Sequence, residues 1–347
     1  MVTNKVFEYN QKFELESGAS LPELKLFYTT YGKLNANKSN VIWICHAFSG
    51  NSDFTDWWSG LFGKGRLYDP EKHFVICVNM LGGCYGSTGP LSINPSTHKP
   101  YFHDFPLITN KDLVRSYDLV RKHLKIEHIH TVIGCSMGGQ QAIEWAVKSP
   151  TLIDYLVAIG ANAKHSPWAI AFNETQRMAI SADQTWNENV EHAGMEGMKA
   201  ARAIGLLSYR NYVCYEAKQH EISDEVYDNF KASSYQNYQG VKMQQRFNAY
   251  SYWIISKAMD SQNVGRGRGG IENALKRIKA KSLFLGIDND ILFPIVEQKF
   301  LAKQVQGAVY GEIDSYYGHD GFLLEFDKLN VAIGNFYSNS LAQRKSA

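Results

Sequence analysis

The sequence predicts an α/β protein with a mostly parallel central sheet, helices on both faces of that sheet, and an inserted α-helical segment. Two observations predict the sheet: short continuous apolar runs recur along the chain, and helical patterns separate them. Continuous apolar runs are typical of parallel strands buried on both faces, which alternate with helices in this class. A third observation predicts the insertion, because the alternation stops near residue 163 and resumes after residue 270.

Composition excludes several classes of protein. The 347 residues suit one large domain with an insertion, and 36 basic against 34 acidic residues leave a net charge of +2. This balance provides no broad field for binding nucleic acid or a membrane surface. No apolar run reaches the roughly 18 residues of a transmembrane helix, and we expect no signal peptide. The five cysteines are odd in number and lack metal-ligand spacing, so we expect no bound metal, reduced thiols and a cytoplasmic location.

Residues 1–162 are predicted to form the first part of the α/β core. Two strand-like runs, 6–13 and 24–31, flank a polar turn and predict an antiparallel hairpin at a sheet edge. Asp112, a candidate N-cap, precedes apolar residues at helical spacing, which predicts a helix through residue 124. The other patterns predict a helix at 140–147 and buried strands at 40–45, 73–79, 130–134 and 155–160.

Residues 163–270 are predicted to form a helical insertion long enough to be a lid. The sequence there is rich in Gln, Asn, Tyr and Arg and has no buried-strand runs. The Gly-Arg-rich stretch at 265–270 has two interpretations, an RGG-type nucleic-acid segment or a hinge. RGG segments occur as long disordered repeats, so we favour a hinge or loop.

Residues 271–347 are predicted to form the second part of the core. Strands are expected at 282–287 and 308–313, and helices at 296–304 and 323–337. In a parallel sheet the loops after the carboxyl ends of the strands build the site.

The most informative short motif is Gly134-Cys135-Ser136-Met137-Gly138. It follows a β-branched run and precedes a helical pattern, which is the setting of a nucleophile elbow. A serine on such a sharp turn leaves no room for Cβ atoms two residues to either side. The helix that follows directs its first N–H groups at developing negative charge. The bare pattern also arises by chance, so the serine needs partners.

Two later loops supply partners for Ser136. Asp288 and Asp290 follow the strand at 282–287, and His319 follows the strand at 308–313. The order Ser, Asp, His is that of the α/β-hydrolase fold, in which the histidine activates the serine and the aspartate orients the histidine. Either aspartate could reach the histidine. His46 follows an earlier strand and is interpreted as structural.

Further distinctive motifs extend along the chain: Cys45–Gly50, Leu81–Pro90, Ser92–Pro95, Gly134–Gly139, Phe172–Arg177, Ala201–Arg210, Gln244–Tyr252 and Tyr317–Asp320. Together they resemble the homoserine O-acetyltransferases, an acyltransferase family with the α/β-hydrolase fold. The resemblance extends over essentially the whole chain, and the Gly-Gly-Cys-Tyr-Gly-Ser-Thr-Gly-Pro run is far more specific than the elbow motif.

The resemblance implies a role for each matching catalytic residue. The family's nucleophile corresponds to Ser136 and its base to His319. Its acid corresponds to Asp290, in preference to Asp288. Its oxyanion donors correspond to the backbone amide of Met137 and an amide in the His-Ala-Phe loop, that of Phe48.

The resemblance also implies the substrates and two residues that bind them. The acyl donor is acetyl-CoA, the acceptor is L-homoserine, and no cofactor stays bound. Arg202 corresponds to the family's carboxylate-binding arginine, and Asp320 to the aspartate that meets the amino group. A zwitterionic amino acid requires such a cation and anion at a fixed separation. The family further implies a two-step transfer through an acyl-serine in methionine biosynthesis, and a homodimer formed through the lid.

Three departures from the family pattern concern the site. Cys135 replaces a glycine in the elbow, and its side chain is expected to point away from the pocket. Asn289 replaces a serine before the acid. The loop from Gly50 to Trp57 is shorter than in many relatives and is expected near the acyl-donor entrance.

Several alternative functions are compatible with the same residues. The enzyme could transfer a succinyl group, use L-serine as acceptor, or act as an esterase. A different class, a hydrolase-fold binding protein without activity, would be expected to lack one of the three catalytic side chains, and here all three positions are filled.

Overall fold

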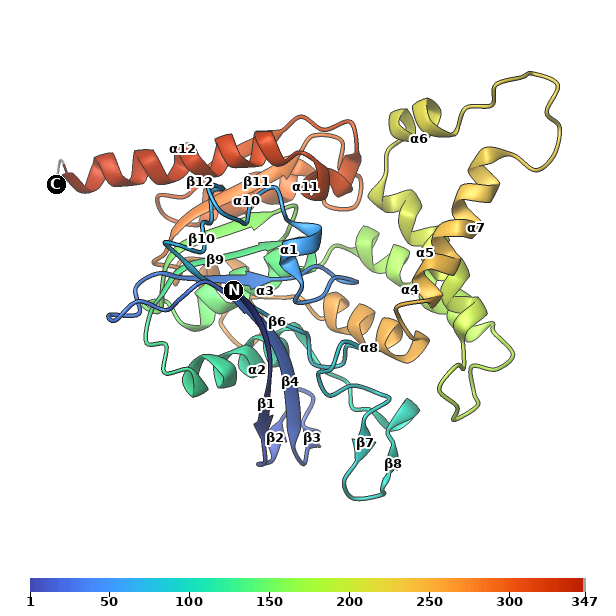
Figure 1. Ribbon diagram of the computed structural model, residues 1–347, viewed down its shortest axis with the longest axis horizontal. Helices are drawn as coiled ribbons and strands as arrows, with labels where there is room; N and C mark the ends of the chain where they lie inside the picture. The colour runs from blue at the N-terminus through green and yellow to red at the C-terminus, as the bar shows by residue number, and fades with distance from the viewer. Residues whose placement is uncertain (346–347) are drawn as a thin grey trace.

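The computed structural model describes residues 1–345 of the chain. Its centre is an eight-stranded sheet in the order β1-β4-β6-β5-β9-β10-β11-β12 (Figure 1). Strand β4 is antiparallel to both of its neighbours, and every other pair is parallel. The predicted edge hairpin and mostly parallel sheet are therefore confirmed. The strands are β1 (Val2–Tyr9), β4 (Leu24–Tyr31), β5 (Val41–Cys45), β6 (Phe74–Val78), β9 (Ile129–Cys135), β10 (Ile153–Ile159), β11 (Lys281–Ile287) and β12 (Val309–Ile313).

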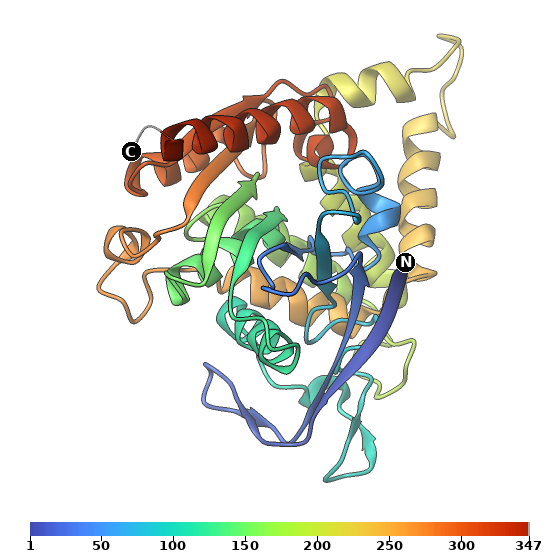
Figure 2. The ribbon, with the colours of Figure 1, turned by 60° about the vertical axis from the view of Figure 1, so that its left-hand side comes forward.

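Helices cover both faces of the sheet, because the central strands are apolar on both sides. In β5, Trp43 packs into one core cluster, whereas Ile42 and Ile44 pack into the other. The first cluster includes residues of α2 (Asn110–His123), α3 (Met137–Lys148) and α10 (Ile295–Gln304), and the second includes residues of α12 (Phe326–Lys345) and Phe54 of α1 (Phe54–Trp57). Figure 2 shows α12 and α2 on opposite sides of the central strands.

Helix α2 begins three residues earlier than predicted. Its N-cap is Thr109, whose side chain accepts a hydrogen bond from the N–H of Asp112. The carboxylate of Asp112 accepts in return from the N–H of Thr109, which completes a capping box. The prediction of Asp112 as the N-cap is therefore wrong, because Asp112 is the N3 partner of that box.

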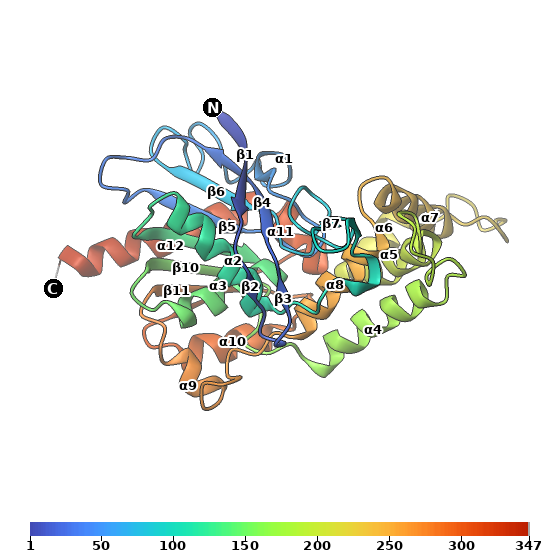
Figure 3. The same ribbon diagram turned by 90° about the horizontal axis from the view of Figure 1, so that it is seen from below.

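Five helices lie between β10 and residue 270, where the sequence predicts the lid. In Figure 3 they stand together beside the sheet. Helix α4 packs against α5 and α8, and α5 packs against α7. A β-bridge between Lys164 and Asn263 joins the two ends of the segment. The exact lid bounds, 163–270, stay a prediction. The helices are α4 (Pro167–Ser181), α5 (Met195–Tyr209), α6 (Tyr212–Gln219), α7 (Lys231–Gln244) and α8 (Ala249–Asp260), and α9 (Ile271–Leu275) follows them.

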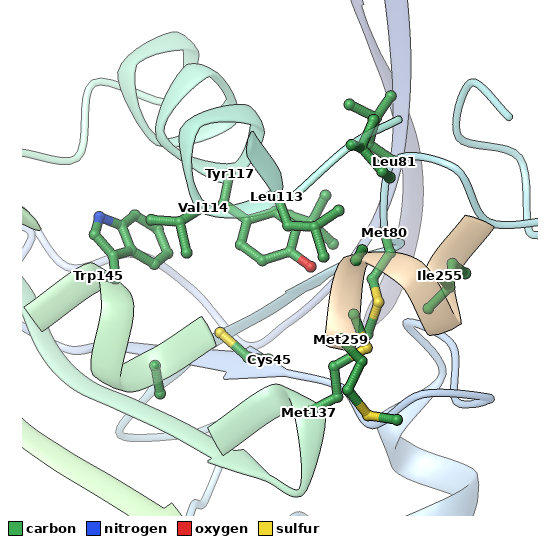
Figure 4. Packing of buried hydrophobic residues seen from close by; sticks show 14 of the residues in the cluster. Cys45, Met80, Leu81, Leu113, Val114, Tyr117, Met137, Trp145, Ile255 and Met259 are labelled. Carbon is green, nitrogen blue, oxygen red and sulfur yellow. The ribbon is translucent and has the colours of Figure 1, made fainter. Parts of the chain in front are cut away.

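The helical segment shares a core with the rest of the chain. Figure 4 shows Ile255 and Met259 of α8 near Met80 and Met137, on the side where α2 and α3 pack on the sheet. The Gly-Arg-rich stretch is folded onto the core, because Arg266 pairs with Glu16 and Arg268 pairs with Glu144. This arrangement fits the loop interpretation rather than a nucleic-acid segment.

The remaining elements are short and surround the sheet. Within residues 1–345, no helix is long and apolar enough to cross a membrane. The short elements are β2 (Phe13–Glu14), β3 (Ser20–Leu21), β7 (Ile93–Asn94), β8 (Lys99–Pro100), α11 (Gly321–Leu324) and the 3-10 helices η1 (Phe102–Asp104) and η2 (Gly318–Asp320).

Candidate active site

Ser136 lies on the sharp turn between β9 and α3. Its φ of 55° and ψ of −128° place it in a region that residues with a side chain rarely adopt. A Cβ on Gly134 would lie 2.2 Å from the carbonyl oxygen of Gly138, and a Cβ on Gly138 would lie 2.0 Å from the carbonyl oxygen of Cys45. Only glycine fits at these two positions, which explains the spacing of the motif.

Ser136, His319 and Asp290 form a continuous hydrogen-bonded chain. Nε2 of His319 lies 2.8 Å from Oγ of Ser136, and Nδ1 of His319 lies 2.5 Å from Oδ2 of Asp290. The three residues are 6%, 2% and 4% exposed, respectively. With Nδ1–H donated to Asp290, Nε2 is free to accept the serine proton.

The loops after β11 and β12 hold this chain in place. Oδ1 of Asp290 accepts hydrogen bonds from the backbone N–H groups of Leu292 and Phe293, both at 2.8 Å. The ring of Phe293 stacks on the imidazole of His319 at a centroid distance of 5.1 Å. The carboxylate and the imidazole are therefore oriented before substrate arrives.

Asp288, the alternative acid, has a different environment. It is exposed, and Oδ1 accepts hydrogen bonds from the N–H groups of Asn289 at 2.8 Å and Ser315 at 3.0 Å. Asp288 thus stabilises the loop, and the structure pairs His319 with Asp290 instead.

His46 is separate from the hydrogen-bonded chain. Its Nε2 accepts a hydrogen bond from the N–H of Met80 at 3.2 Å, and Nδ1 lies 2.9 Å from the carbonyl oxygen of Ala47. Burial lowers the pKa of His46 to about 4, so the ring is neutral near pH 7. It stabilises the loop after β5, in agreement with its structural interpretation.

One predicted oxyanion donor, Met137, belongs to the elbow itself, and the other, Phe48, belongs to the loop after β5. Met137 is the first residue of α3, and the first N–H groups of a helix have no acceptor within it. Phe48 belongs to a turn closed by the hydrogen bond from Gly50 N–H to the Ala47 carbonyl oxygen, 2.9 Å. The ring of Phe48 packs edge-on against Tyr252 of α8 at 4.7 Å, which ties this turn to the helical segment.

Ser136 and His319 line a cavity of about 400 Å³. Arg202, Asp320 and Phe48 also line it, so the structure brings the predicted substrate residues to the predicted nucleophile. Cys135 is fully buried in the second core cluster, away from this space, as expected. The lining also includes Gly50 and Trp57, the ends of the short loop noted in the sequence.

Arg202 and Asp320 differ in how their charges are compensated. The guanidinium of Arg202 lies 5.4 Å from the ring centroid of Tyr209, and within residues 1–345 it makes no ion pair. Asp320 forms an ion pair with Arg210, with Oδ2 2.7 Å from Nε, and both side chains are largely buried. The sequence assigned no partner to Asp320, because two residues 110 positions apart meet only through the fold.

Sequence reasoning missed several residues of the cavity wall. Gln239, Lys242, Met243 and Arg246, from α7 and the turn after it, all line the cavity, as does Asp56 of α1. The spacing of the first four, at i, i+3, i+4 and i+7, is that of one helix face. Hydrophobic periodicity did not single out this face, because three of its four side chains are polar. Within the part of the chain that the structure describes, no group of three or more His, Cys, Asp or Glu side chains could hold a metal ion.

Comparison with known proteins places this site in a family. The model of the α/β hydrolase fold matches residues 40–326. The chain is 50% identical to the homoserine O-acetyltransferase of Cyclobacterium marinum, over 97% of this chain and 95% of that protein. It is 42% identical to that of Chlorobium chlorochromatii, over 94% and 93% of the two chains. The chain belongs to the homoserine O-acetyltransferase family.

Solved structures confirm the fold. The crystal structure of homoserine O-acetyltransferase from Bacillus anthracis matches with a TM-score of 0.89 at 26% identity, over 97% of each chain. That of an esterase matches with a TM-score of 0.87, also at 26% identity, over 97% of this chain and all of that chain. The predicted α/β-hydrolase fold and the predicted enzyme family are both confirmed, and the esterase shows that the same scaffold also supports hydrolysis.

Proposed function

We propose that this chain transfers an acetyl group from acetyl-CoA to the hydroxyl of L-homoserine, forming O-acetyl-L-homoserine for methionine biosynthesis. The observation that supports this most directly is the content of one cavity: a hydrogen-bonded serine and histidine, an arginine that forms no ion pair within residues 1–345, and a carboxylate. A plain esterase needs only the first two. The cation and anion suit the carboxylate and ammonium groups of an amino acid.

The first half-reaction acylates Ser136. Nε2 of His319 takes the Oγ proton, and Oγ attacks the thioester carbonyl carbon. The N–H groups of Phe48 and Met137 stabilise the negative charge on the carbonyl oxygen. The C–S bond then breaks, His319 returns its proton to the sulfur, and CoA leaves.

The second half-reaction transfers the acetyl group. Arg202 binds the carboxylate of homoserine, and Asp320 binds its ammonium group. His319 takes the proton of the homoserine hydroxyl, whose oxygen attacks the acetyl carbon of the acyl-enzyme. The ester bond to Ser136 breaks, and His319 returns the proton to Oγ. Asp290 stabilises the imidazolium in both halves.

Transfer requires that water be kept from the acyl-enzyme. Helices α5 and α7 supply Arg202, Tyr209 and Met243 to the cavity wall, so the helical segment covers the nucleophile. We assign it the role of a lid that excludes water and positions the acceptor hydroxyl.

Steady-state kinetics test this function. A two-step transfer with acetyl-CoA and homoserine should give parallel lines in double-reciprocal plots, and Ser136→Ala should abolish turnover. Intersecting lines, or a fully active Ser136→Ala, would contradict the mechanism. Turnover rates with succinyl-CoA in place of acetyl-CoA, and with L-serine in place of homoserine, distinguish the acetyltransferase from the alternative acyltransferases. Failure of a serine-directed phosphonate to label Ser136 would favour a binding protein without activity.

An esterase is the second candidate, favoured by the structural match to an esterase at 26% identity. Both activities pass through the same acyl-enzyme. They differ in whether its acetyl group is transferred to homoserine or to water. With acetyl-CoA as donor, the ratio of O-acetylhomoserine to free acetate should be high. An acetate yield that homoserine does not lower would identify a hydrolase.

We also propose a cytoplasmic homodimer, without a permanently bound cofactor. The five cysteines are all free, which suits a reducing compartment. Large exposed apolar side chains gather on α6, α7 and the segment between them, as at protein interfaces: Tyr212, Val213, Ile222, Tyr227, Phe230, Tyr238 and Val241. Light scattering should give a mass of two chains. The double variant Ile222→Glu, Tyr227→Glu should give the mass of a single chain.

A further inference from the structure

One face of α7 and the turn after it contributes two cations to the active-site cavity. Lys242 and Arg246 both line it, together with Gln239 and Met243 of the same face. Lys242 and Arg246 are also exposed. They therefore lie where the cavity meets solvent, whereas Ser136 and His319 are buried.

Neither cation is neutralised by a carboxylate of the part of the chain that the structure describes. Within residues 1–345, Lys242 and Arg246 form no ion pair. Nη1 of Arg246 donates hydrogen bonds to the carbonyl oxygen of Ser49 at 2.7 Å and to the hydroxyl of Tyr85 at 2.8 Å, both uncharged acceptors. Asp56 lies on the α1 side of the cavity and pairs with neither of them. Two like charges in one mouth oppose each other unless an anion binds there.

The acceptor does not account for these charges. Homoserine carries one carboxylate, for which Arg202 is already available, and its ammonium group would be repelled by further cations. The acetyl group is neutral. The remaining anionic groups in the reaction are the phosphates of the acyl donor, which lie at the end of CoA remote from the thioester.

We infer that Lys242 and Arg246 form an anion subsite that binds the phosphate groups of the acyl-CoA donor; this rests on the proposed function. Lys242 supplies a mobile point charge. Arg246 is held in place by Ser49 and Tyr85, with Nη2 also donating to the hydroxyl of Ser49 at 3.4 Å, and its planar guanidinium has further N–H donors for an anion. Arg246 also lines an adjoining hollow of about 610 Å³ beside Gly83–Ser92, so the bound phosphates have space on either side of it.

A purely structural role for Arg246 predicts a different result. Its hydrogen bond to Ser49 fixes the turn that contains Phe48. Loss of this hydrogen bond should therefore slow the reaction with every acyl donor equally. Loss of an anion subsite should slow the reaction only with acyl donors that carry phosphate groups. Comparison of acetyl-CoA with S-acetylpantetheine, which has the same thioester but no phosphate, separates the two roles.

The experiment compares Lys242→Met, Arg246→Gln and, as a matched control, Lys303→Met, an exposed lysine of α10 outside the cavity. We expect Lys242→Met and Arg246→Gln each to lower the ratio of kcat/KM for acetyl-CoA to that for S-acetylpantetheine by about tenfold. The loss should appear in the KM for acetyl-CoA and should shrink at high salt. The ratio for Lys303→Met should equal that of the wild type.

A second arm measures binding by the phosphates themselves. Adenosine 3′,5′-bisphosphate should inhibit the wild type competitively against acetyl-CoA, with an inhibition constant about tenfold weaker in Lys242→Met. Inorganic phosphate at the same concentration should inhibit far less. An unchanged donor ratio in both variants would overturn the subsite. A wild type without Ser136-dependent turnover of acetyl-CoA would instead overturn the proposed function, so the two failures are distinct.

Discussion

Arg268 binds the carboxylate of Glu144 with two parallel hydrogen bonds, 2.8 Å and 2.5 Å long. Glu144 lies on α3, the helix whose N-cap is Ser136, and is 1% exposed. Arg268 follows the helical segment and is itself largely buried. This pair therefore connects the segment that covers the cavity to the helix that begins at Ser136.

Replacing Arg268 by Gln should destabilise the protein strongly. The change leaves the buried carboxylate of Glu144 without a counter-charge, which typically costs about 3 kcal/mol in free energy of unfolding. Urea unfolding followed by circular dichroism measures it. Arg277→Gln, at an exposed arginine that forms no ion pair in the described chain, serves as the control. Equal midpoints for Arg268→Gln and the control would contradict this prediction.

A second ion cluster makes stability depend on pH. Glu16, in the turn of the N-terminal hairpin, accepts hydrogen bonds from Nζ of Lys111 at 2.6 Å and from Nε and Nη2 of Arg266 at 2.9 and 2.8 Å. Burial alone would raise the pKa of Glu16. The hydrogen bonds from Arg266 and Lys111 outweigh burial and lower the pKa of Glu16 to about 2, from an ordinary value of 4.5.

This lowered pKa fixes the direction of the pH effect. The folded state holds the charged carboxylate more tightly than the unfolded state does. The stabilisation is therefore complete above about pH 4.5 and is lost as the pH falls toward 2. Glu16→Gln should lower the free energy of unfolding by about 1–2 kcal/mol at pH 7, allowing for partial exposure, and the difference from wild type should narrow below pH 4.5. A pH-independent difference would contradict this assignment.

Sequence patterns predicted the sheet well because its strands are buried on both faces. The runs ending at Cys45 and Val78 are apolar throughout, and the run ending at Cys135 has an apolar centre, so this pattern needs no long-range information. The elbow was predictable for a similar reason, since Gly134 and Gly138 are required by local backbone approach. Helix α2 shows the limit of local patterns, because Thr109 and Asp112 are both good capping residues and only the backbone shows which is the N-cap.

Long-range pairings in the site were not predictable from patterns. By their position in the loop alone Asp288 and Asp290 are equivalent, and the preference for Asp290 came only from the family resemblance; in the structure, burial and hydrogen bonding separate the loop-stabilising carboxylate from the one bound to His319. The ion pair of Asp320 with Arg210 joins a core loop to the end of α5. The α7 face with Lys242 and Arg246 is polar, so amphipathic periodicity gives no sign that it lines a cavity.

Arg202 should determine the affinity for the acceptor. Its guanidinium is unpaired within residues 1–345 and lies in the cavity with Ser136. Arg202→Gln removes the charge and should raise the KM for homoserine about 10- to 100-fold, while slow hydrolysis of acetyl-CoA persists. Arg202→Lys should recover part of the loss, because it restores the charge without the planar fork. Initial rates at varied homoserine measure both effects, and an unchanged KM in Arg202→Gln would remove Arg202 from the acceptor site.

The two aspartates of the β11 loop provide the sharpest test of the catalytic assignment. Asp290→Asn keeps the size of the side chain but presents an amide to Nδ1 of His319. This change favours the tautomer with the proton on Nε2, which cannot accept the proton of Ser136. We expect kcat to fall on the order of 10³- to 10⁴-fold. Asp288→Asn alters an exposed carboxylate of the same loop, so kcat should stay close to that of the wild type.

Acyl-enzyme formation separates catalysis from folding in this pair of variants. Both should give wild-type circular dichroism, and the burst of CoA release on mixing with acetyl-CoA should be slowed only in Asp290→Asn. The outcome depends on the 2.5 Å contact between Oδ2 of Asp290 and Nδ1 of His319, for which Asp288 has no counterpart. A larger loss in Asp288→Asn than in Asp290→Asn would reverse the assignment of the acid, because both substitutions remove one charge from the same loop.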